Sequence, residues 1–420
     1  MAMENQGRGD KRRRVVLVPY PFQGHITPML QLGSILHSRG FSVTVAHPQY
    51  NSPPPSAHSE LEFHTLYDGL SGYDMSFYNL LAAIYAMNEN CKASLEEYLI
   101  PTIVLRPFSA IYLHSLLSVL QQSDAIFPFQ DDSILEPLPG LYPLRFKDLP
   151  FPTINNDVLE PVVEFSVRSN DIRSSVACIW NSVDELENSA LSKLQQRYKV
   201  PFFPIGPFHK RASDSSTSLR EEDTSCLEWL DSQAPGSVLY ISIGSLVHIS
   251  EKDLVETAWG LANSEQQFLW VVRPGSVNGC DQLPEGFERA IGDRGRIVKW
   301  APQRRVLSHR AVGGFMSHCG WNSTLESICE GVPMICTPVI SDQPVNARYI
   351  TEVWKVGMEL ERAERGVVET TIRKLMAGSE GRELRKRVVD LKLKLESCMQ
   401  KGGSSYQALD ELVEFISSLP

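Results

Sequence analysis

Residues 311–331 contain the pattern that most narrows the possible folds of this chain. Ala311–Ser317 is a short, mostly apolar run of the kind expected for a buried strand, residues 318–322 have the composition of a turn, and a helix is expected from Ser323 onward. Ser323 and Glu326 have the S-x-x-E spacing of a capping box, which predicts that the helix begins at Ser323. A strand that leads through a turn into a helix indicates an α/β fold.

Similar apolar runs recur along the whole chain. They cover residues 14–19, 41–46, 61–66, 102–105, 176–180 and 200–205 in the first half, and residues 237–243, 268–272, 296–299 and 332–339 in the second. Continuous apolar runs are typical of strands buried on both faces of a parallel sheet. Helices are expected at residues 79–99, 185–197, 364–381, 382–399 and 406–418.

The predicted fold class is α/β, with two doubly wound, Rossmann-like domains that face each other across a cleft. A length of 420 residues suits two domains of about 200 residues each. The polar segment 208–225 is interpreted as a linker between an N-terminal domain (residues 1–207) and a C-terminal domain (residues 226–400). Residues 401–420 then form a separate C-terminal helix.

The expected helix start at Ser323 suits an anionic ligand. The first backbone N–H groups of a helix point away from its N-terminus, and the macrodipole adds about half a positive charge there. A diphosphate fits such a position. His318 and Asn322 would add hydrogen-bond donors on the same edge, and the indole of Trp300 could stack on a flat base.

Asp342 and Gln343 follow the last apolar run, so they fall at the carboxyl end of a strand, where ligands of open α/β sheets bind. A carboxylate beside an amide suits sugar hydroxyls. Taken singly, several candidates also fit structural roles: Glu326 as a capping residue, Trp300 as core and His318 as a hydrogen-bonded turn histidine. Their combination at these spacings indicates a binding site for a sugar nucleotide.

Residues 300–343 resemble the signature box of plant family 1 UDP-dependent glycosyltransferases, position by position and without a gap. The resemblance covers nearly the whole chain and continues through PFQGH (21–25), IWN (179–181), PIGP (204–207), SIGS (242–245) and FLWVVRP (268–274). It implies a GT-B-like fold in which the C-terminal helix returns to the N-terminal domain. It also implies inverting transfer of glucose from UDP-glucose, the donor substrate, to a hydroxyl or a nitrogen of a small apolar acceptor. No tightly bound cofactor and no metal are expected.

The resemblance implies a role for each donor-site residue. The full set that it implies is Ser245, Trp300, Ala301, Gln303, His318, Gly320, Trp321, Asn322, Ser323, Glu326, Asp342 and Gln343. Trp300 would stack on uracil, and Gln303 and Glu326 would hold the ribose side. The phosphates would be contacted by His318, Asn322, Ser323 and Ser245, and the sugar by Trp321, Asp342 and Gln343. Gln rather than His as the last residue of the box indicates a preference for glucose.

His25 is the predicted general base. It lies between an expected strand and an expected helix, for which Thr27 is the candidate cap and Pro28 the first residue, and so it falls on the ligand edge of the sheet. Position alone also fits a histidine hydrogen-bonded in a tight turn. A neutral imidazole with an ordinary pKa of about 6.5 can accept a hydroxyl proton, and the resemblance assigns His25 this catalytic role.

The sequence departs from the family at Ile100-Pro101. The family has a further strand and helix at this junction, and that strand carries the aspartate that holds the catalytic histidine. Asp68, Asp74 and Asp124 do not match its context, and none is assigned its role. Loss of such an acid costs about 10⁴ in rate in the serine-protease triad. A catalytically impaired variant that binds UDP-sugar without efficient turnover is therefore an alternative; a nucleotide-sugar epimerase or hydrolase is another.

Charge and composition limit the partners and the location of the chain. A formal net charge of −10 argues against nucleic acid as a partner. The basic run at residues 11–14 is interpreted as a solvated tail, with a nuclear signal as the alternative. Residues 1–14 lack the apolar core of a signal peptide and no apolar run is long enough to span a membrane, so a cytoplasmic monomer is expected. The eight cysteines lack C-x-x-C pairing, which favours reduced, buried thiols.

Overall fold

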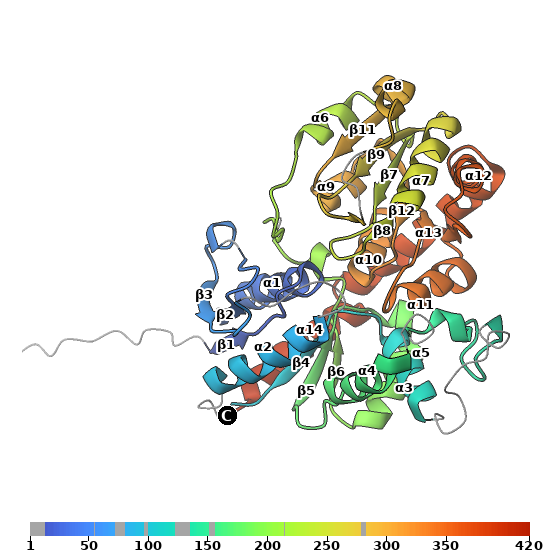
Figure 1. The fold of residues 1–420 in the computed structure, drawn as a ribbon. Helices are drawn as coiled ribbons and strands as arrows, with labels where there is room; N and C mark the ends of the chain where they lie inside the picture. Colours follow the sequence, from blue (N-terminus) through green and yellow to red (C-terminus); the bar gives the residue numbers. More distant parts are fainter. Residues whose placement is uncertain are drawn as a thin grey trace, which may run out of the picture.

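The structure is a computed structural model that describes residues 13–53, 55–71, 80–95, 100–121, 135–150, 156–213, 215–278 and 283–420. Strands and helices alternate along most of the chain, and the sheets are built from parallel strand pairs. The chain folds into two lobes, with β1–β6 in the lower and β7, β9, β11 and β12 in the upper lobe of Figure 1. This confirms the predicted α/β fold with two Rossmann-like halves.

The C-terminal half is built on one six-stranded sheet with the order β11-β9-β7-β12-β13-β14. Its strands are β7 (Val238–Ser242), β9 (Gln267–Val271), β11 (Gly295–Val298), β12 (Val312–Ser317), β13 (Met334–Cys336) and β14 (Gly357–Glu359). Its helices are α6 (Ser225–Asp231), α7 (Glu251–Ser264), α8 (Phe287–Ile291), α9 (Gln303–Leu307), α10 (Trp321–Glu330), α11 (Gln343–Arg348), α12 (Arg365–Met376) and α13 (Ser379–Met399). A separate two-stranded sheet pairs β8 (Ile249–Ser250) with β10 (Val277–Asn278). The central strands β7 and β12 are buried along their whole length, which explains why their sequences are continuously apolar.

The described residues of the N-terminal half form two three-stranded sheets instead of one continuous sheet. The first joins β1 (Arg14–Leu17), β2 (Ser42–Pro48) and β3 (Glu62–Leu66), and the second joins β4 (Ile103–Arg106), β5 (Ala177–Trp180) and β6 (Phe202–Pro204). The helices are α1 (Gln23–Ser38), α2 (Leu80–Leu95), α3 (Ala110–Gln121), α4 (Asn156–Ser169) and α5 (Asp184–Tyr198). In the described part of the chain β1 pairs only with β2 and β4 only with β5, so each has one edge without a partner strand.

The two faces of these sheets are covered differently. On one face a single cluster joins both sheets, because residues such as Leu17 and Ile179 pack together with α1 and the C-terminal helix α14 (Ser404–Ser418). On the opposite face the core is divided between a cluster under α2 and a cluster that includes α3 and α5. Val16, on this opposite face of β1, and Val18, just beyond the end of the strand, remain 37% and 39% exposed. The structure therefore has an incomplete core at β1.

Helix α14 belongs to the N-terminal half in space, although it is the last element of the chain. Figure 1 shows its red ribbon in the lower lobe, and its Leu409, Leu412 and Ile416 are buried in the cluster that contains β1 and β6. Arg39, the C-cap of α1, forms an ion pair with Asp410 of α14, with 2.6 Å between Nη1 and Oδ1. The chain thus crosses back from the C-terminal half before it ends.

Two expected helix starts are wrong. Helix α1 begins at Gln23, with Phe22 as N-cap, so Thr27 and Pro28 lie inside it instead of at its start. Helix α10 begins at Trp321, with Gly320 as N-cap and no side-chain capping bond, so Ser323 and Glu326 do not form a capping box. In both cases the N-cap is a residue without a capping side chain, and the expected capping residue has other partners.

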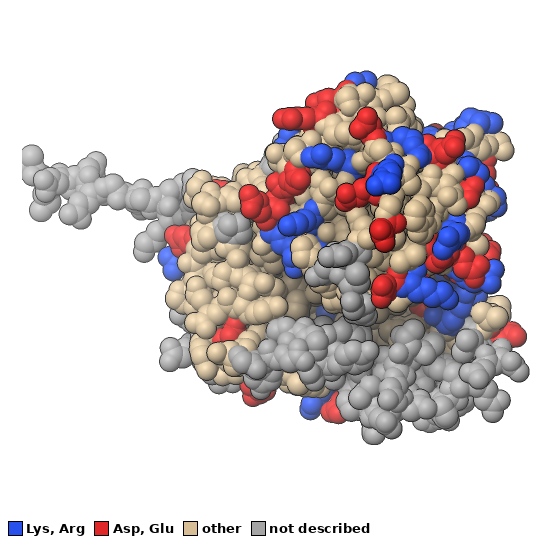
Figure 2. All heavy atoms as spheres, turned by 45° about the horizontal axis from the view of Figure 1, so that its top comes forward, with Lys and Arg blue, Asp and Glu red and all other residues tan. Residues whose placement is uncertain are grey.

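Charges of both signs are interleaved over the C-terminal half on the face shown in Figure 2. The described part of the N-terminal half shows few charged side chains on that face. Within the described residues, no helix is long and apolar enough to cross a membrane. The cysteines that the structure describes are free thiols, and all but Cys398 are buried.

Candidate functional site

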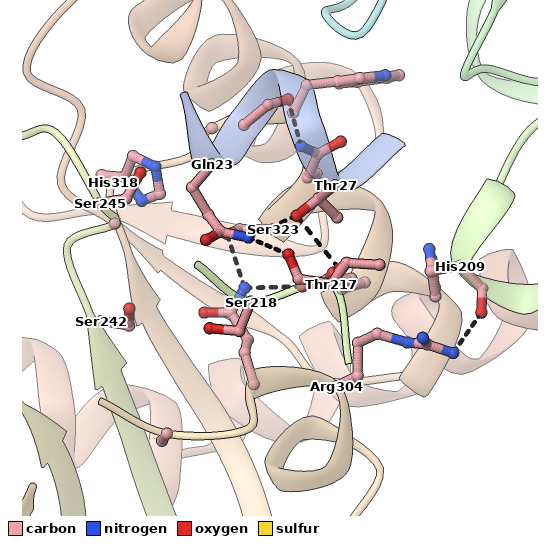
Figure 3. A pocket seen from close by; sticks show the side chains of 18 of the residues that line it. Gln23, Thr27, His209, Thr217, Ser218, Ser242, Ser245, Arg304, His318 and Ser323 are labelled. Atoms are coloured by element: carbon pink, nitrogen blue, oxygen red, sulfur yellow. Dashed lines mark hydrogen bonds between the residues drawn. The ribbon is translucent and has the colours of Figure 1, made fainter. Parts of the chain in front are cut away.

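One cavity of about 970 Å³ lies between the two halves of the molecule. It is lined by His25 from the N-terminal half and by every predicted donor-site residue: Ser245, Trp300, Ala301, Gln303, His318, Gly320, Trp321, Asn322, Ser323, Glu326, Asp342 and Gln343. Figure 3 shows part of this cavity, with Ser245 and His318 on one side of Ser323 and with α1 residues Gln23 and Thr27 nearby. The structure thus brings all predicted site residues to one place.

The turn from β12 to α10 is tightly packed around His318. A Cβ atom on Gly244, whose φ is +83°, or on Gly320 would lie 2.5 Å from Nε2 of the imidazole, so glycine is required at both positions. Cys319, between His318 and Gly320, has a φ of 64°, an uncommon conformation for a residue other than glycine. Two glycines and one strained residue therefore place His318 at the N-terminus of α10.

Burial lowers the pKa of His318 to about 4, although a hydrogen bond with the Ser242 backbone opposes the shift. The imidazole is therefore neutral at pH 7. Its Nδ1 is buried and finds no hydrogen-bond partner among the described residues. A ligand oxygen at the helix start would supply a partner for such a group.

Gln303 joins the helix start to a buried carboxylate. Its Nε2 donates to Ser323 Oγ at 2.9 Å and to Glu326 Oε2 at 2.7 Å, and its Oε1 accepts from the Tyr240 hydroxyl at 3.4 Å. Burial raises the pKa of Glu326 to about 7 in spite of the hydrogen bond from Gln303. Glu326 is thus a buried acceptor in the wall of the cavity, held in place by Gln303.

Asp342 and Gln343 are fixed differently from each other. Gln343 Oε1 accepts from the backbone N–H groups of Val339 and Ile340 at 2.9 and 3.1 Å, so its carbonyl group closes the loop before α11. Asp342 Oδ2 accepts from Asn346 Nδ2 at 2.8 Å, and burial raises its pKa to about 6. At pH 7 the Asp342 carboxylate is mostly ionised and can accept further hydrogen bonds.

Trp300 contacts the segment that connects the two halves. Its Nε1 donates to Ser218 Oγ at 2.8 Å, and the guanidinium carbon of Arg220 lies 5.5 Å from the ring centroid. On the other side of the segment, Gln23 Nε2 donates to the Thr217 carbonyl at 2.9 Å and Gln23 Oε1 accepts from Leu219 N at 2.7 Å. The predicted linker is therefore part of the cavity wall, which sequence reasoning missed.

His25 lies in the first turn of α1, with its backbone N–H donating to the Phe22 carbonyl at 2.8 Å. Its ring packs edge-on against Tyr20 and Phe22, with 5.7 and 6.2 Å between centroids. Burial lowers the pKa of His25 to about 4, and no carboxylate is among the causes of that shift. Aromatic packing and helix geometry, rather than an acid, orient this imidazole in the described structure.

None of the aspartates considered as a partner for His25 is placed beside it among the described residues. Asp68 is buried and accepts from the backbone N–H groups of Tyr50 and Leu70 at 2.7 and 3.0 Å, so it stabilises its own loop. Asp74 and Asp124 lie outside the described residues. No group of three or more His, Cys, Asp or Glu side chains that could hold a metal ion is found in the part of the chain that is described.

Two residues that were not predicted as site residues also join the halves at the cavity. Asn181, after β5, accepts from Trp321 Nε1 through its backbone oxygen at 2.7 Å and donates through Nδ2 to Asn322 Oδ1 at 3.4 Å. Asn322 Nδ2 in turn donates to the Gly24 carbonyl at 3.0 Å. Pro28 is the sequence feature that could have revealed this role of Gly24. In a regular helix residue 28 would donate its N–H to the Gly24 carbonyl, but a proline has no N–H to donate.

Comparison with known proteins agrees with this geometry. A family model described as "UDP-glucoronosyl and UDP-glucosyl transferase" matches residues 182–383. A Solanum lycopersicum protein named UDP-glycosyltransferase 76E1 is 57% identical, with 98% of this chain and 94% of that protein covered. An Arabidopsis thaliana flavonol 3-O-glucosyltransferase, UGT76E12, is 42% identical, with 97% and 98% covered. The structure of Phytolacca americana UGT2 with UDP-2fluoro-glucose and pterostilbene matches at a TM-score of 0.80 and 27% identity, over 99% of this chain and 100% of that one.

The alignment with the Solanum lycopersicum protein also shows a difference in length. It extends over 446 residues, more than the 420 residues of this chain, although only 98% of the chain takes part. That relative therefore has a few tens of residues without a counterpart here. A strand, a helix and their loops need about 30 residues, so the difference agrees with the expected loss of one strand and one helix.

Proposed function

Because the chain belongs to the UDP-glycosyltransferase family, a family of enzymes that transfer sugar from a UDP-sugar, we propose that its donor is UDP-glucose and its acceptor a small apolar molecule. Glucose passes to a hydroxyl or a nitrogen of the acceptor with inversion at the anomeric carbon and without a metal. The observation that carries this proposal is that one cavity is lined both by His25 and by Trp321, Asn322 and Ser323 at the start of α10. Pro107, Phe108 and Ile340 line the same cavity and offer apolar surface to an acceptor.

In the proposed mechanism, His25 acts as the general base. Its lowered pKa keeps the imidazole neutral at pH 7, so it can take the acceptor proton as the nucleophile attacks the anomeric carbon. Asp342 and Gln343 hold the sugar, and Gln303 and Glu326 hold the ribose. The departing UDP is stabilised by the N–H groups at the start of α10 and by His318 and Ser245. Placement of both substrates supplies most of the rate gain.

The function is tested by titrating UDP and assaying glucose transfer on the same sample, with a panel of acceptors read by mass spectrometry. UDP binding together with a glucoside product supports the proposal. Labelled UDP-glucose incubated without acceptor serves as the control for hydrolysis or epimerisation. The acceptor panel identifies the substrate class.

A second candidate function is binding of UDP-sugar without efficient turnover. Two observations favour it: no carboxylate contributes to the pKa shift of His25, and among the described strands β1 and β4 each have one edge without a partner. The donor site itself lies mainly on the intact six-stranded half. Tight UDP binding with no product from any acceptor of the panel would establish this second function and end the first.

We predict that His318→Ala and Ser323→Ala each weaken UDP binding about 10- to 100-fold. A hydrogen bond to a charged group contributes about 1.5–3 kcal/mol, and each 1.4 kcal/mol is a factor of ten in affinity. Isothermal titration with UDP measures the effect. His309→Ala is the matched control, because His309 lies in the same half and pairs with Asp231. Unchanged UDP affinity in both site variants would contradict the placement of the diphosphate.

We also predict that His25 stays neutral down to about pH 5. Its pKa of about 4 lies below the ordinary value because burial disfavours the charged imidazolium and no carboxylate compensates. The base is active when deprotonated, so protonation of His25 should not lower the transfer rate between pH 8 and pH 5. Histidine NMR, with the signal assigned by its loss in His25→Ala, measures the titration. A midpoint at or above 6.5 would reveal an acid beside the ring.

A further inference from the structure

The carbonyl of Gly24, in the first turn of α1, lacks its usual helical donor. In an α-helix this carbonyl would accept from the N–H four residues on, but that residue is Pro28, which has none. A proline ring also clashes with the carbonyl four residues earlier and displaces it from the helix axis. The Gly24 oxygen is thus available for a partner outside α1, one residue before His25.

Asn322 of the opposite half supplies that partner. Its Nδ2 donates to the Gly24 oxygen at 3.0 Å, and its Oδ1 accepts from Asn181 Nδ2 at 3.4 Å. Both bonds need the amide in the same orientation, because an exchange of its oxygen and nitrogen would break both. Asn322 is thereby held between the end of β5 and the first turn of α1.

Asn181 is itself firmly placed. Its Oδ1 accepts from Phe208 N at 2.9 Å, and its backbone oxygen accepts from the indole N–H of Trp321 at 2.7 Å. A Cβ on Gly206 would lie 2.9 Å from this Oδ1, so only glycine leaves room for the Asn181 side chain there. The three residues Asn181, Asn322 and Gly24 form a chain of contacts that crosses twice between the halves.

We propose that Asn322 is a positioning residue that latches the start of the donor-site helix α10 to the His25 turn. The resemblance assigned Asn322 to the phosphates, but one amide hydrogen is already used by Gly24. The same side chain therefore joins the start of α10, where the donor diphosphate is proposed to bind, to the turn that carries the base. The latch explains how the position of His25 relative to the donor is kept in a chain whose described residues place no acid beside that ring.

Pro28 provides a sharp test, because Pro28→Ala gives the Gly24 carbonyl an N–H within its own helix. Asn322→Ala should speed hydrogen exchange of the His25 and Ile26 amides about three- to tenfold, the range expected for loss of one hydrogen bond between uncharged groups. In the Pro28→Ala background, Asn322→Ala should have no such effect, because the bond it removes is already replaced. Asn188→Ala, on the surface of α5, is the control asparagine.

The exchange measurement does not need turnover, so it tests the latch even if the protein transfers no glucose. Only the expected effect on the transfer rate rests on the proposed function. If the protein transfers glucose, Asn322→Ala and Pro28→Ala should each lower kcat about tenfold and change the Kd for UDP less than threefold, and the double variant should be no slower. Faster exchange in both backgrounds, or in neither, would overturn the latch. A fall in UDP affinity at unchanged kcat would leave Asn322 a phosphate ligand only.

Discussion

Replacing His25 by alanine is expected to reduce glucose transfer by about 10²- to 10⁴-fold, the contribution typical of a positioned general base. The Kd for UDP should stay within about twofold, because the donor groups lie on the C-terminal half. The transfer rate should fall because His25, in the first turn of α1, is the histidine of residues 1–207 that lines the cavity. Initial rates at saturating UDP-glucose and titration with UDP on the same preparation measure the two quantities.

The control for this variant is His64→Ala, which removes an exposed histidine of β3 in the same half. It should leave both quantities unchanged. If His25→Ala lowered UDP affinity in parallel with transfer, the residue would be structural and the base would lie elsewhere. The edge-on packing of Tyr20 and Phe22 against the ring makes a thermal-denaturation check on the variant necessary.

The second large expected effect is an increase in the rate of glucose transfer. Inserting, at Ile100-Pro101, the residues that the Solanum lycopersicum relative has in excess should raise the transfer rate by up to about 10⁴-fold, the cost of losing the acid in the serine-protease triad. The added strand would pair with the edges of β1 and β4 that have no partner among the described strands, and its helix would cover Val16 and Val18. The acid that the resemblance places on that strand would stabilise the imidazolium of His25 and raise its pKa.

Three measurements separate the parts of this prediction. The melting temperature should rise because apolar surface is buried, the rate should rise, and the His25 titration should move from about pH 4 towards higher pH. The same insertion with its acids changed to asparagine should keep the gain in stability and lose the gain in rate. An insertion that changes neither stability nor rate would show that the break in the sheet has another cause.

The strands were predictable to within a few residues because parallel strands buried on both faces need continuous apolar sequence. The run at residues 311–317 became β12, and the run at residues 237–243 became β7. The helix starts were not predictable in the same way. Thr27 and Ser323 are residue types that often cap helices, but their hydroxyl groups accept from Thr217 and Gln303. Local spacing cannot reveal partners that arrive from other elements.

The residues proposed for the donor site could be selected from the sequence because all of them except Ser245 lie within residues 300–343, and the structure places them around one cavity. The contacts that join the halves could not, because they connect residues far apart in the chain. Asn181 and Asn322 are 141 positions apart, and Asn322 and Gly24 are 298 apart. Their pairing depends on how the two halves are docked, which no local pattern encodes. The shifted pKa values of His25 and Glu326 likewise depend on burial that only the fold creates.

The interrupted sheet of the N-terminal half has a consequence for the fate of the chain in a cell. A strand with a free row of N–H and C=O groups is a template for any other extended polypeptide, and exposed valines beside it add apolar attraction. Natural proteins usually cover such edge strands or place charged side chains on them. An uncovered edge of this kind is expected to lower solubility during synthesis, where aggregation and proteolysis compete with folding. Cellular abundance of the folded molecule, as much as its chemistry, would then set how much product a cell could make.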